Sequence, residues 1–417
     1  MQVESARHFG NYHSQREFAD QGRKTAARRA CDQAGDSFAV FCCDLITYPG
    51  QWPATWQQGR THVDESRFRN LVSGQSTGIL AYCLRLALSA ASAGYGLAIV
   101  LRNWLFDRGW KVVHRSSVSV ISVGNITTGG TGKTPIVAMV CQMLLEAGTR
   151  PGIVSRGYRS VDGRANDEKL VLNILCPGTP HEQNPDRVKA ARQLTSTDTT
   201  DATSVSAIVM DDGFQHRRLH RDLNIVLIDA TNPFGYEQLL PRGLMREPLS
   251  SLRRADVVII TRSDLVDQTA LQHIEQSVVN AAPQLVGRIL SAVFQPTSLR
   301  YRDGSTMLLE EASGMAVYLM AGIGNPDAFQ TTAARTGMHV TGTSWFPDHH
   351  HYSDADLEQV QKKAIAARGA FIVTTLKDLV KLPENSDNVV ALEIAAVFPD
   401  SKHSTLLKNL IREAIAR

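Results

Sequence analysis

The chain has 417 residues, a length that accommodates two or three domains of about 150 residues each. Hydrophobic residues make up 43% and charged residues 20%, as in ordinary globular proteins, which excludes a wholly disordered or fibrous chain. The formal charge of +3 gives no reason to expect a nucleic acid as partner, and the mean hydropathy of −0.16 excludes a polytopic membrane protein.

The N-terminal part of the chain differs from the rest. Residues 1–76 are rich in Gln, Arg, Asp and Ser and lack periodic apolar runs, so we expect a poorly ordered or extraneous extension. Residues 79–101 are apolar, with Arg85 as their one charge, and are long enough to cross a bilayer. Cationic and aromatic residues follow up to Lys111, which suits an anionic lipid surface. We therefore predict a membrane-associated helix over 77–112, with a buried core helix as the alternative.

Beyond residue 113 the pattern alternates between strands and helices. Strands are expected over 117–123, 151–155, 205–212, 224–230 and 255–264, and a helix over 135–148. Near-continuous Val, Ile and Leu runs are typical of a parallel sheet covered on both faces. A second set of strands is expected over 316–324, 338–346 and 371–375, with helices from 327 and over 354–368. This pattern predicts a second, smaller α/β unit.

The strongest motif is GNITTGGTGKTP, which runs from Gly124 to Pro135 between a predicted strand and a predicted helix. Its glycines allow backbone N–H groups to surround phosphates, while Lys133 reaches the β- and γ-phosphates and the Thr134 hydroxyl binds Mg²⁺. Thr127 stands where the strict phosphate-loop pattern has a glycine, but the strand–loop–helix context supports the motif. The predicted nucleotide-binding residues are Thr127, Thr128, Gly129, Gly130, Thr131, Gly132, Lys133 and Thr134.

The phosphate loop defines the expected fold class. It is α/β: a P-loop NTPase-type parallel sheet flanked by helices over 113–310, with the smaller C-terminal α/β unit over 311–417. The loop is similar to the K-G-G-x-G-K-T loops of partitioning ATPases, yet Thr128 takes the place of their signature lysine.

Two adjacent carboxylates end the strand predicted over 205–212. Asp211 and Asp212 open the segment DDGFQH, and an acidic residue at this place in a phosphate-loop enzyme holds Mg²⁺. Helix capping by Asp212 is the alternative. Thr261–Asp264, TRSD, resembles the base-reading turn of GTPases, although strand-to-helix turns often end in Asp simply as a cap, so no preference for GTP follows. The predicted metal ligands are Thr134, Asp211 and Asp212.

Several segments occur in the order found in tetraacyldisaccharide 4′-kinases, and the chain resembles this family from about Gly78 onward. They are SVGNITTGGTGKTP, SRGY (155–158), NDE (166–168), DDGFQH (211–216), LPRGLMREP (240–248), RRAD (253–256), GIGNP (322–326), FPDHH (346–350) and VTTLKD (373–378). DDGFQH and FPDHH together are specific, whereas the loop alone is not.

The resemblance implies an ATP- and Mg²⁺-dependent kinase of lipid A biosynthesis. Such an enzyme phosphorylates the 4′-hydroxyl of a tetraacylated glucosamine disaccharide 1-phosphate, giving lipid IVA, at the cytoplasmic face of the bacterial inner membrane. The implied partners are this acylated lipid substrate and the membrane surface, with no nucleic acid and no obligate protein partner.

The resemblance also assigns catalytic residues. The family's base is the Asp of a G-D-E motif, which falls on Asp167, and its supporting histidine falls on His349, beside Asp348. An imidazole can orient the carboxylate or accept its proton near neutral pH. Asp167, His349 and Lys133 are therefore the candidate catalytic residues. Without the resemblance, Asp167 is interpreted as a solvated loop carboxylate. His349, His350 and His351 could instead form a metal-binding tract, but consecutive side chains point in different directions and cannot easily ligate one ion.

A few positions depart from the family pattern. Asn166 stands where glycine is usual, and Asn tolerates unusual backbone angles. Arg242 and Met245 alter the usual L-P-A-G-P-L-R-E-P, and Leu376 replaces the glutamate of T-T-E-K-D. Leu376 removes a carboxylate and leaves Lys377 and Asp378 to act alone at that corner.

Two other classes of function remain open at this point. A regulatory P-loop GTPase or ATPase switch, or a metallochaperone-like protein, would fit the phosphate loop, the paired aspartates and TRSD. A nucleotide-binding membrane adaptor without enzymatic activity is the third possibility. The absence of the signature lysine and the presence of FPDHH argue against the switch.

Overall fold

The computed structural model describes residues 65–157, 166–196, 204–324, 326–347, 350–383 and 386–416. Most of the predicted extension over 1–76 lies outside these ranges, as do Asp348 and His349. The chain forms two compact units. Of the described residues, the first unit contains 65–98 and 238–246, and the second contains all the others, including both sheets.

The first unit consists of α3 (Glu65–Ser73), most of α4 (Ile79–Asp107) and the segment 238–246. Ser92 Oγ on α4 donates a hydrogen bond to the carbonyl of Leu239 over 2.8 Å, and the Tyr95 hydroxyl donates to the carbonyl of Arg246 over 2.8 Å. Within the described residues, α4 is the one helix long and apolar enough to cross a membrane, and only 22% of its most apolar window is buried. This exposure argues against the alternative of a buried core helix.

The first sheet of the second unit has seven strands in the order β3-β2-β4-β1-β5-β6-β7, all parallel. Their bounds are β1 Ser119–Asn125, β2 Pro151–Ser155, β3 His181–Gln183, β4 Ala207–Asp211, β5 Leu223–Asp229, β6 Val257–Thr261 and β7 Ile289–Ser291. β2, β4 and β6 are buried along their whole length, as their apolar runs predicted. β1 lies where the strand order reverses, and ligands of such sheets bind at the carboxyl ends of the strands there.

Helices cover both faces of this sheet. α5 (Lys133–Glu146) and α6 (Asp167–Leu175) pack on the face to which Ile121 points, and α7 (Arg187–Thr195) packs on the face of Val120. α8 (Gln268–Ala281) completes the set between β6 and β7. Successive residues of β1 thus point into two apolar clusters, which is the arrangement that strand alternation requires.

The second sheet has six strands in the order β11-β10-β12-β13-β8-β9, of which β8 and β9 are antiparallel to their neighbours. The strands are β8 Val293–Arg300, β9 Thr306–Leu308, β10 Ala316–Ala321, β11 His339–Trp345, β12 Phe371–Thr375 and β13 Val389–Val397, and the helices among them are α9 Leu309–Ala312, α10 Pro326–Arg335, α11 Asp354–Ala366 and α12 Leu376–Leu379. β8 and β9 belong to the second sheet, yet both precede residue 311, where the C-terminal α/β unit was predicted to begin. The predicted α/β fold class with a parallel P-loop-type sheet flanked by helices is confirmed, and the second sheet lies in the same compact unit as the first.

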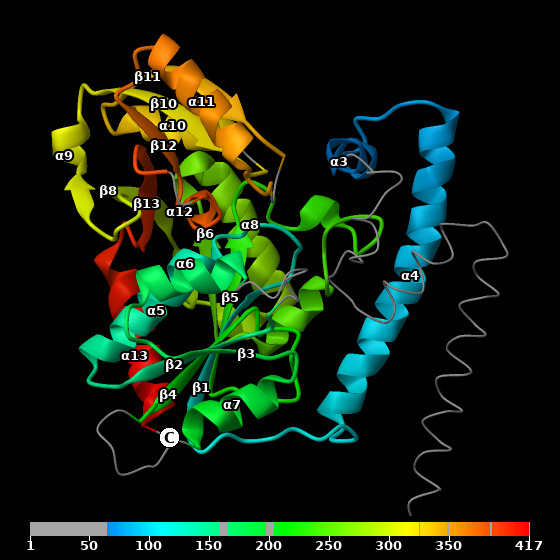
Figure 1. Ribbon diagram of the computed structural model, residues 1–417. Helices are drawn as coiled ribbons and strands as arrows, with labels where there is room; N and C mark the ends of the chain where they lie inside the picture. Colours follow the sequence, from blue (N-terminus) through cyan, green and yellow to red (C-terminus); the bar gives the residue numbers. More distant parts are fainter. Residues whose placement is uncertain are drawn as a thin grey trace, which may run out of the picture. The chain divides into compact units, whose positions relative to one another are not determined.

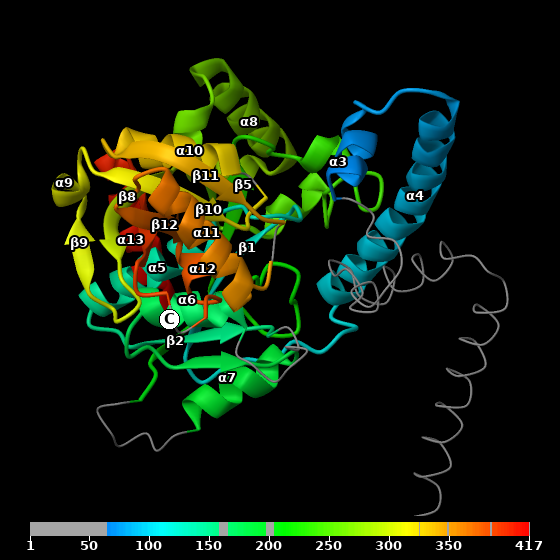
Figure 2. The same cartoon turned by 45° about the horizontal axis from the view of Figure 1, so that its top comes forward.

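The last helix, α13 (Ser401–Ile415), follows the second sheet in the chain but packs on the first. Leu407, Leu410 and Ile411 lie in the same apolar cluster as Val140 of α5. Lys408 on α13 pairs with Glu146 at the end of α5 over 2.9 Å. Figures 1 and 2 show α13, in red, beside α5 and the strands of the first sheet. The core of the nucleotide-binding half therefore includes the C-terminal helix.

Candidate active site

The phosphate loop joins β1 to α5 at the carboxyl edge of the first sheet. α5 begins at Lys133, so Pro135 is its third residue and lies in the first turn, where a missing N–H costs no helix bond. Gly132 has φ 80°, in the left-handed region, which glycine adopts without strain. Gly124, at the end of β1, permits a close approach, because a Cβ there would lie 2.7 Å from Cβ of Phe214.

The loop lysine faces the paired carboxylates that the sequence predicted as metal ligands. Lys133 Nζ lies 3.5 Å from Asp212 Oδ1 and 3.5 Å from Asn125 Oδ1. Asp211 is the last residue of β4, and Asp212 follows it with φ 50° in a turn. β5 is the next element, so Asp212 caps no helix, and the capping alternative does not apply. The structure thus brings Lys133, Asp211 and Asp212 together.

The carboxylate pair fits a divalent cation. Burial raises the pKa of Asp211 to about 7, and Glu168 and Asp212 add to this effect while Lys133 opposes it. The Oδ1 atom of Asp211 is buried and has no hydrogen-bond partner among the described residues. No group of three or more His, Cys, Asp or Glu suited to a metal occurs in the described part of the chain. Carboxylate and hydroxyl oxygens are the ligand types that Mg²⁺ prefers, so Asp211 and Asp212, with the predicted Thr134, would hold such an ion and supply charge neutralisation for phosphates.

Two residues that sequence reasoning did not single out connect the two loops. Asn125 is fully buried, and its Nδ2 donates to Thr131 Oγ1 over 3.1 Å. Gln215 Nε2 donates to the Asn125 carbonyl over 2.9 Å. Asn125 therefore ties the phosphate loop to DDGFQH, and its polarity inside an apolar strand end was the signal available in the sequence.

Two arginines, Arg221 and Arg254, contact the DDGFQH loop. The Arg221 guanidinium donates to the carbonyls of Gly213, Phe214 and His216 over 3.4, 3.3 and 3.2 Å. Burial lowers the pKa of Arg221 to about 10, with nearby arginines contributing. Arg254 lies over the Phe214 ring at 4.5 Å. These contacts fix the turn that carries the two carboxylates.

The predicted base, Asp167, is the first residue of α6 and is half-buried. Asn166 is the N-cap of this helix, and its side chain accepts a hydrogen bond from the N–H of Glu168 over 3.1 Å. Asn166 has φ −64°, so the position does not need the unusual angles that a glycine would offer. The charge of Glu168, the second residue of α6, raises the pKa of Asp211.

The predicted catalytic histidine, His349, lies outside the described residues, but its neighbours are fixed. His350 stacks on Phe346 with ring centroids 4.7 Å apart, and its Nε2 lies 3.2 Å from Asp356 Oδ2. Tyr352 lies in one apolar cluster with Val171 of α6. The segment that follows FPDHH and the helix that Asp167 begins therefore contribute to the same apolar cluster.

Leu376, which replaces the family glutamate, is buried in the same cluster as Val171. An apolar contact thus takes the place of a carboxylate between α12 and α6. Asp378 is fully buried and accepts hydrogen bonds from the Gly322 N–H over 3.1 Å and from Lys381 Nζ over 2.9 Å. Asp378 therefore serves the packing of α12 in the described structure, with Lys381 as its partner in place of the neighbouring Lys377.

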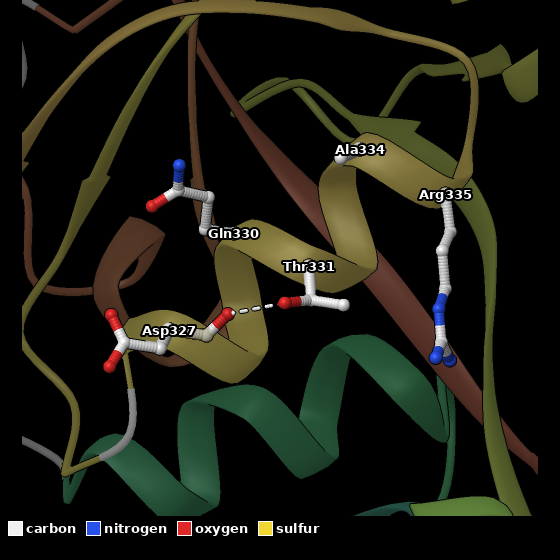
Figure 3. Close-up of a pocket in the computed structure, with 5 residues that line it drawn as sticks. All are labelled: Asp327, Gln330, Thr331, Ala334 and Arg335. Atoms are coloured by element: carbon white, nitrogen blue, oxygen red, sulfur yellow. Dashed lines mark hydrogen bonds between the residues drawn. The ribbon is translucent and has the colours of Figure 1, made fainter.

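The TRSD turn contacts the phosphate loop, and its aspartate faces α10. Asp264 Oδ2 lies 3.7 Å from Arg335 on that helix. A shallow hollow of about 520 Å³ runs along this face of α10 (Figure 3). Its described lining consists of Asp327, Gln330, Thr331, Ala334 and Arg335, and the Thr331 hydroxyl donates to the Asp327 carbonyl over 2.9 Å.

Buried neutral histidines predict a loss of stability in acid. Burial lowers the pKa of His181 to about 4, and its Nε2 lies 2.8 Å from Ser155 Oγ. Between pH 6.5, the ordinary histidine value, and pH 4, the unfolded chain binds a proton that the folded chain does not, so this stability is present above pH 6.5 and is lost as the pH falls. The loss is at most about 1.4 kcal/mol per pH unit.

We therefore expect the melting temperature to drop between pH 7.5 and pH 5, and to drop less in the variant His181→Gln, which cannot be protonated. His273→Gln, at an exposed position of α8, serves as the control and should follow the wild type. Parallel curves for His181→Gln and wild type would contradict the assignment.

A phosphate loop at the end of a parallel strand, a lysine in that loop and carboxylates at the end of the neighbouring strand are typical of P-loop phosphotransferases and nucleotidases. The fold and the site place the protein in this class. A family model described as tetraacyldisaccharide-1-P 4′-kinase (LpxK) matches residues 84–412. The chain belongs to the tetraacyldisaccharide 4′-kinase family, as its motifs predicted.

Individual relatives cover most of the chain. The tetraacyldisaccharide 4′-kinase of Syntrophus aciditrophicus is 36% identical over 319 residues, which is 71% of this chain and 84% of the relative. That of Elusimicrobium minutum is 36% identical over 316 residues, 72% of this chain and 83% of the relative. The crystal structure of LpxK from Aquifex aeolicus in complex with ATP is similar with a TM-score of 0.65 and 28% identity, covering 80% of this chain and 99% of that one.

Proposed function

We propose that this protein transfers the γ-phosphate of ATP to the 4′-hydroxyl of a tetraacylated glucosamine disaccharide 1-phosphate. One observation carries the proposal, in a chain of this family: Lys133 of the phosphate loop lies 3.5 Å from Asp212, which follows Asp211 at the carboxyl end of β4. Phosphoryl transfer needs little covalent help from the protein, because positioning, charge neutralisation and a proton acceptor suffice.

Each residue has a distinct role in this proposal. The phosphate loop from Thr127 to Thr134 binds the triphosphate, and Lys133 neutralises charge on the β- and γ-phosphates. Thr134, Asp211 and Asp212 would hold Mg²⁺, which would offset the negative charge of the phosphates.

Asp167 accepts the proton of the attacking hydroxyl in this proposal. Asp167 is the first residue of α6, and the charge of the next residue, Glu168, raises the pKa of Asp211, which supports a role for this helix start near the nucleotide. His349 supports it in this proposal, and Tyr352, three residues later, shares an apolar cluster with Val171 of α6. The pair would share and orient the proton near neutral pH.

The direct test supplies the purified full chain with γ-labelled ATP, Mg²⁺ and the disaccharide 1-phosphate in detergent. A lipid product that carries a second, labelled phosphate is the expected result. ATP hydrolysis without a phosphorylated lipid would instead favour the regulatory switch, and binding of ATP without any turnover would favour the adaptor.

We further propose that α4 contacts the cytoplasmic face of the inner membrane, from which the acylated substrate is drawn. Its exposed apolar side chains are Ile79, Leu80, Tyr82, Leu84, Leu86, Leu97, Val100, Leu101 and Trp104. Farther along, Arg108 lies over the Trp104 ring at 5.5 Å, and Trp110 beyond the helix is exposed. Exposed apolar side chains, together with basic and aromatic side chains near the end of the helix, favour contact with an anionic lipid surface.

Acidic substitutions on α4 test this proposal. The double variant Leu97→Glu and Leu101→Glu is expected to lose sedimentation with vesicles that contain phosphatidylglycerol, because carboxylates are costly in lipid and are repelled by anionic headgroups. Ile365→Glu is the matched control, since Ile365 on α11 is 73% exposed and Leu97 is 71% exposed. Sedimentation of the double variant to the wild-type extent would refute the contact.

A further inference from the structure

The TRSD turn, Thr261–Asp264, donates hydrogen bonds to backbone carbonyls of the phosphate loop. Thr261 is fully buried at the end of β6, and its hydroxyl donates to the Thr131 carbonyl over 2.9 Å. The next residue, Arg262, donates from its guanidinium to the Gly130 carbonyl over 2.9 Å. Two consecutive residues of the turn thus bind two consecutive carbonyls of the loop.

These contacts set the direction of the loop's N–H groups. In a trans peptide the C=O of one residue and the N–H of the next point in opposite directions. Binding the Gly130 and Thr131 carbonyls from outside therefore turns the N–H groups of Thr131 and Gly132 inward. The Thr131 N–H already donates within the loop, to the Gly129 carbonyl over 3.1 Å. Inward N–H groups are what a phosphate cradle consists of.

Arg262 is itself held in place by an ion pair. Its guanidinium pairs with the Asp229 carboxylate at the end of β5. Asp229 Oδ1 in turn accepts hydrogen bonds from the Thr231 N–H over 3.0 Å and from Thr231 Oγ1 over 2.7 Å. Arg262 has φ 55°, a left-handed conformation that a non-glycine residue keeps only when its surroundings enforce it.

A ring from the second sheet completes this arrangement. The Arg262 guanidinium lies 5.6 Å from the centre of the Phe294 ring, on β8. The same ring lies against the phosphate loop, because a Cβ on Gly132 would come within 2.1 Å of it. Phe294 therefore contacts both the loop and the arginine that braces it.

We propose that Arg262, held by Asp229 and Phe294, is a positioning residue for the triphosphate of the bound nucleotide. It touches neither phosphate nor acceptor in this role, and it acts by keeping the loop carbonyls turned outward. The turn thus has a use in this chain other than reading the nucleotide base. The proposal rests on the proposed kinase function only for its activity readout.

The test compares Arg262→Ala, Arg262→Lys and Asp229→Asn in the full chain. KM for ATP is expected to rise about tenfold or more in Arg262→Ala, as for a lost hydrogen bond to a charged group, while KM for the lipid acceptor stays the same. Arg262→Lys should restore little, because an ammonium lacks the fork that reaches both Asp229 and the Gly130 carbonyl. Asp229→Asn should shift KM for ATP in the same direction.

Binding is read separately from turnover, by the rise in melting temperature that ATP and Mg²⁺ cause. This rise should shrink in the three variants, while their melting temperatures without nucleotide stay near that of the wild type. Arg288→Ala is the matched control: Arg288 donates to the Asp256 carbonyl over 3.4 Å at the opposite end of β6. Its KM and its response to ATP should be unchanged.

The outcomes separate the two proposals. If the wild type responds to ATP but phosphorylates no lipid, the proposed function fails and the binding assay still tests Arg262. If KM for ATP and the response to ATP in Arg262→Ala and Asp229→Asn stay within about twofold of the wild type, the positioning role is overturned. Should Arg262→Ala not fold, Arg262→Lys and Asp229→Asn decide the question.

Discussion

Replacement of Lys133 by methionine is expected to lower kcat for lipid phosphorylation by about a hundredfold to a thousandfold, the usual effect of removing one preorganised charge donor. Methionine keeps most of the aliphatic length of the side chain and removes the ammonium group. In the structure the ammonium nitrogen lies 3.5 Å from Asp212 Oδ1. Its positive charge therefore lies beside the carboxylates, in the loop that receives the phosphates. The fall should appear in kcat more than in KM for the lipid.

A second lysine provides the control for this experiment. Lys408→Met removes an ammonium that pairs with Glu146 over 2.9 Å, at the other end of the helix that Lys133 begins. Lys133 is the first residue of α5 and Lys408 pairs with the last residue of this helix, but only Lys133 lies in the phosphate loop. Wild-type turnover in Lys408→Met together with a loss in Lys133→Met would assign the effect to the site. Turnover of Lys133→Met above about a tenth of the wild-type value would contradict the assignment.

Replacement of Asp167 by asparagine is expected to lower kcat by about a hundredfold to ten-thousandfold, the range for a lost general base. Asparagine preserves the size and shape of the side chain at the first position of α6, so the helix should remain intact. Because Asp167 lies outside the phosphate loop, KM for ATP and the stabilisation by ATP should stay near wild type. Single-turnover transfer of labelled phosphate to the lipid measures the chemical step directly.

Asp354→Asn is the matched control for Asp167. Asp354 is also the first residue of a helix, α11, directly after a side-chain N-cap, and it is exposed. Any general effect of removing a carboxylate from the first turn of a helix would therefore occur in both variants. Equal kcat values for Asp167→Asn and wild type would exclude Asp167 as the base.

Local sequence patterns predicted the parts of the site that one segment supplies. The glycines, Lys133 and Thr134 share one loop, and the carboxylates of Asp211 and Asp212 end one apolar strand, so residue type and spacing suffice to find them. Five strands of the first sheet, β1, β2, β4, β5 and β6, were visible for the same reason, since each contains a short run of Val, Ile or Leu. The short strands β3 (HEQ) and β7 (ILS) carry no such run and were not predicted. Asp167 was different, because its polar surroundings point to a solvated loop and only the family motif singled it out.

Contacts between distant segments could not be found in this way. Arg262 reaches Gly130 across 132 positions of sequence, and Gln215 reaches Asn125 across 90. Nothing near these residues marks the partner, because the parallel order of β1, β5 and β6 decides which loops meet. The antiparallel strands β8 and β9 were also missed, since the alternation of exposed and buried residues in β8 includes Pro296 and few apolar side chains.

The packing of α13 has a consequence for biosynthesis. The apolar face of this helix, which includes Leu407, Leu410 and Ile411, fills the cluster under the first sheet, although the sheet's own strands end at Ser291. A nascent chain that has already produced the phosphate loop and all seven strands still lacks part of their core until α13 has left the ribosome. We therefore expect the nucleotide-binding half to complete its core, and to bind ATP stably, only after α13 has been synthesised.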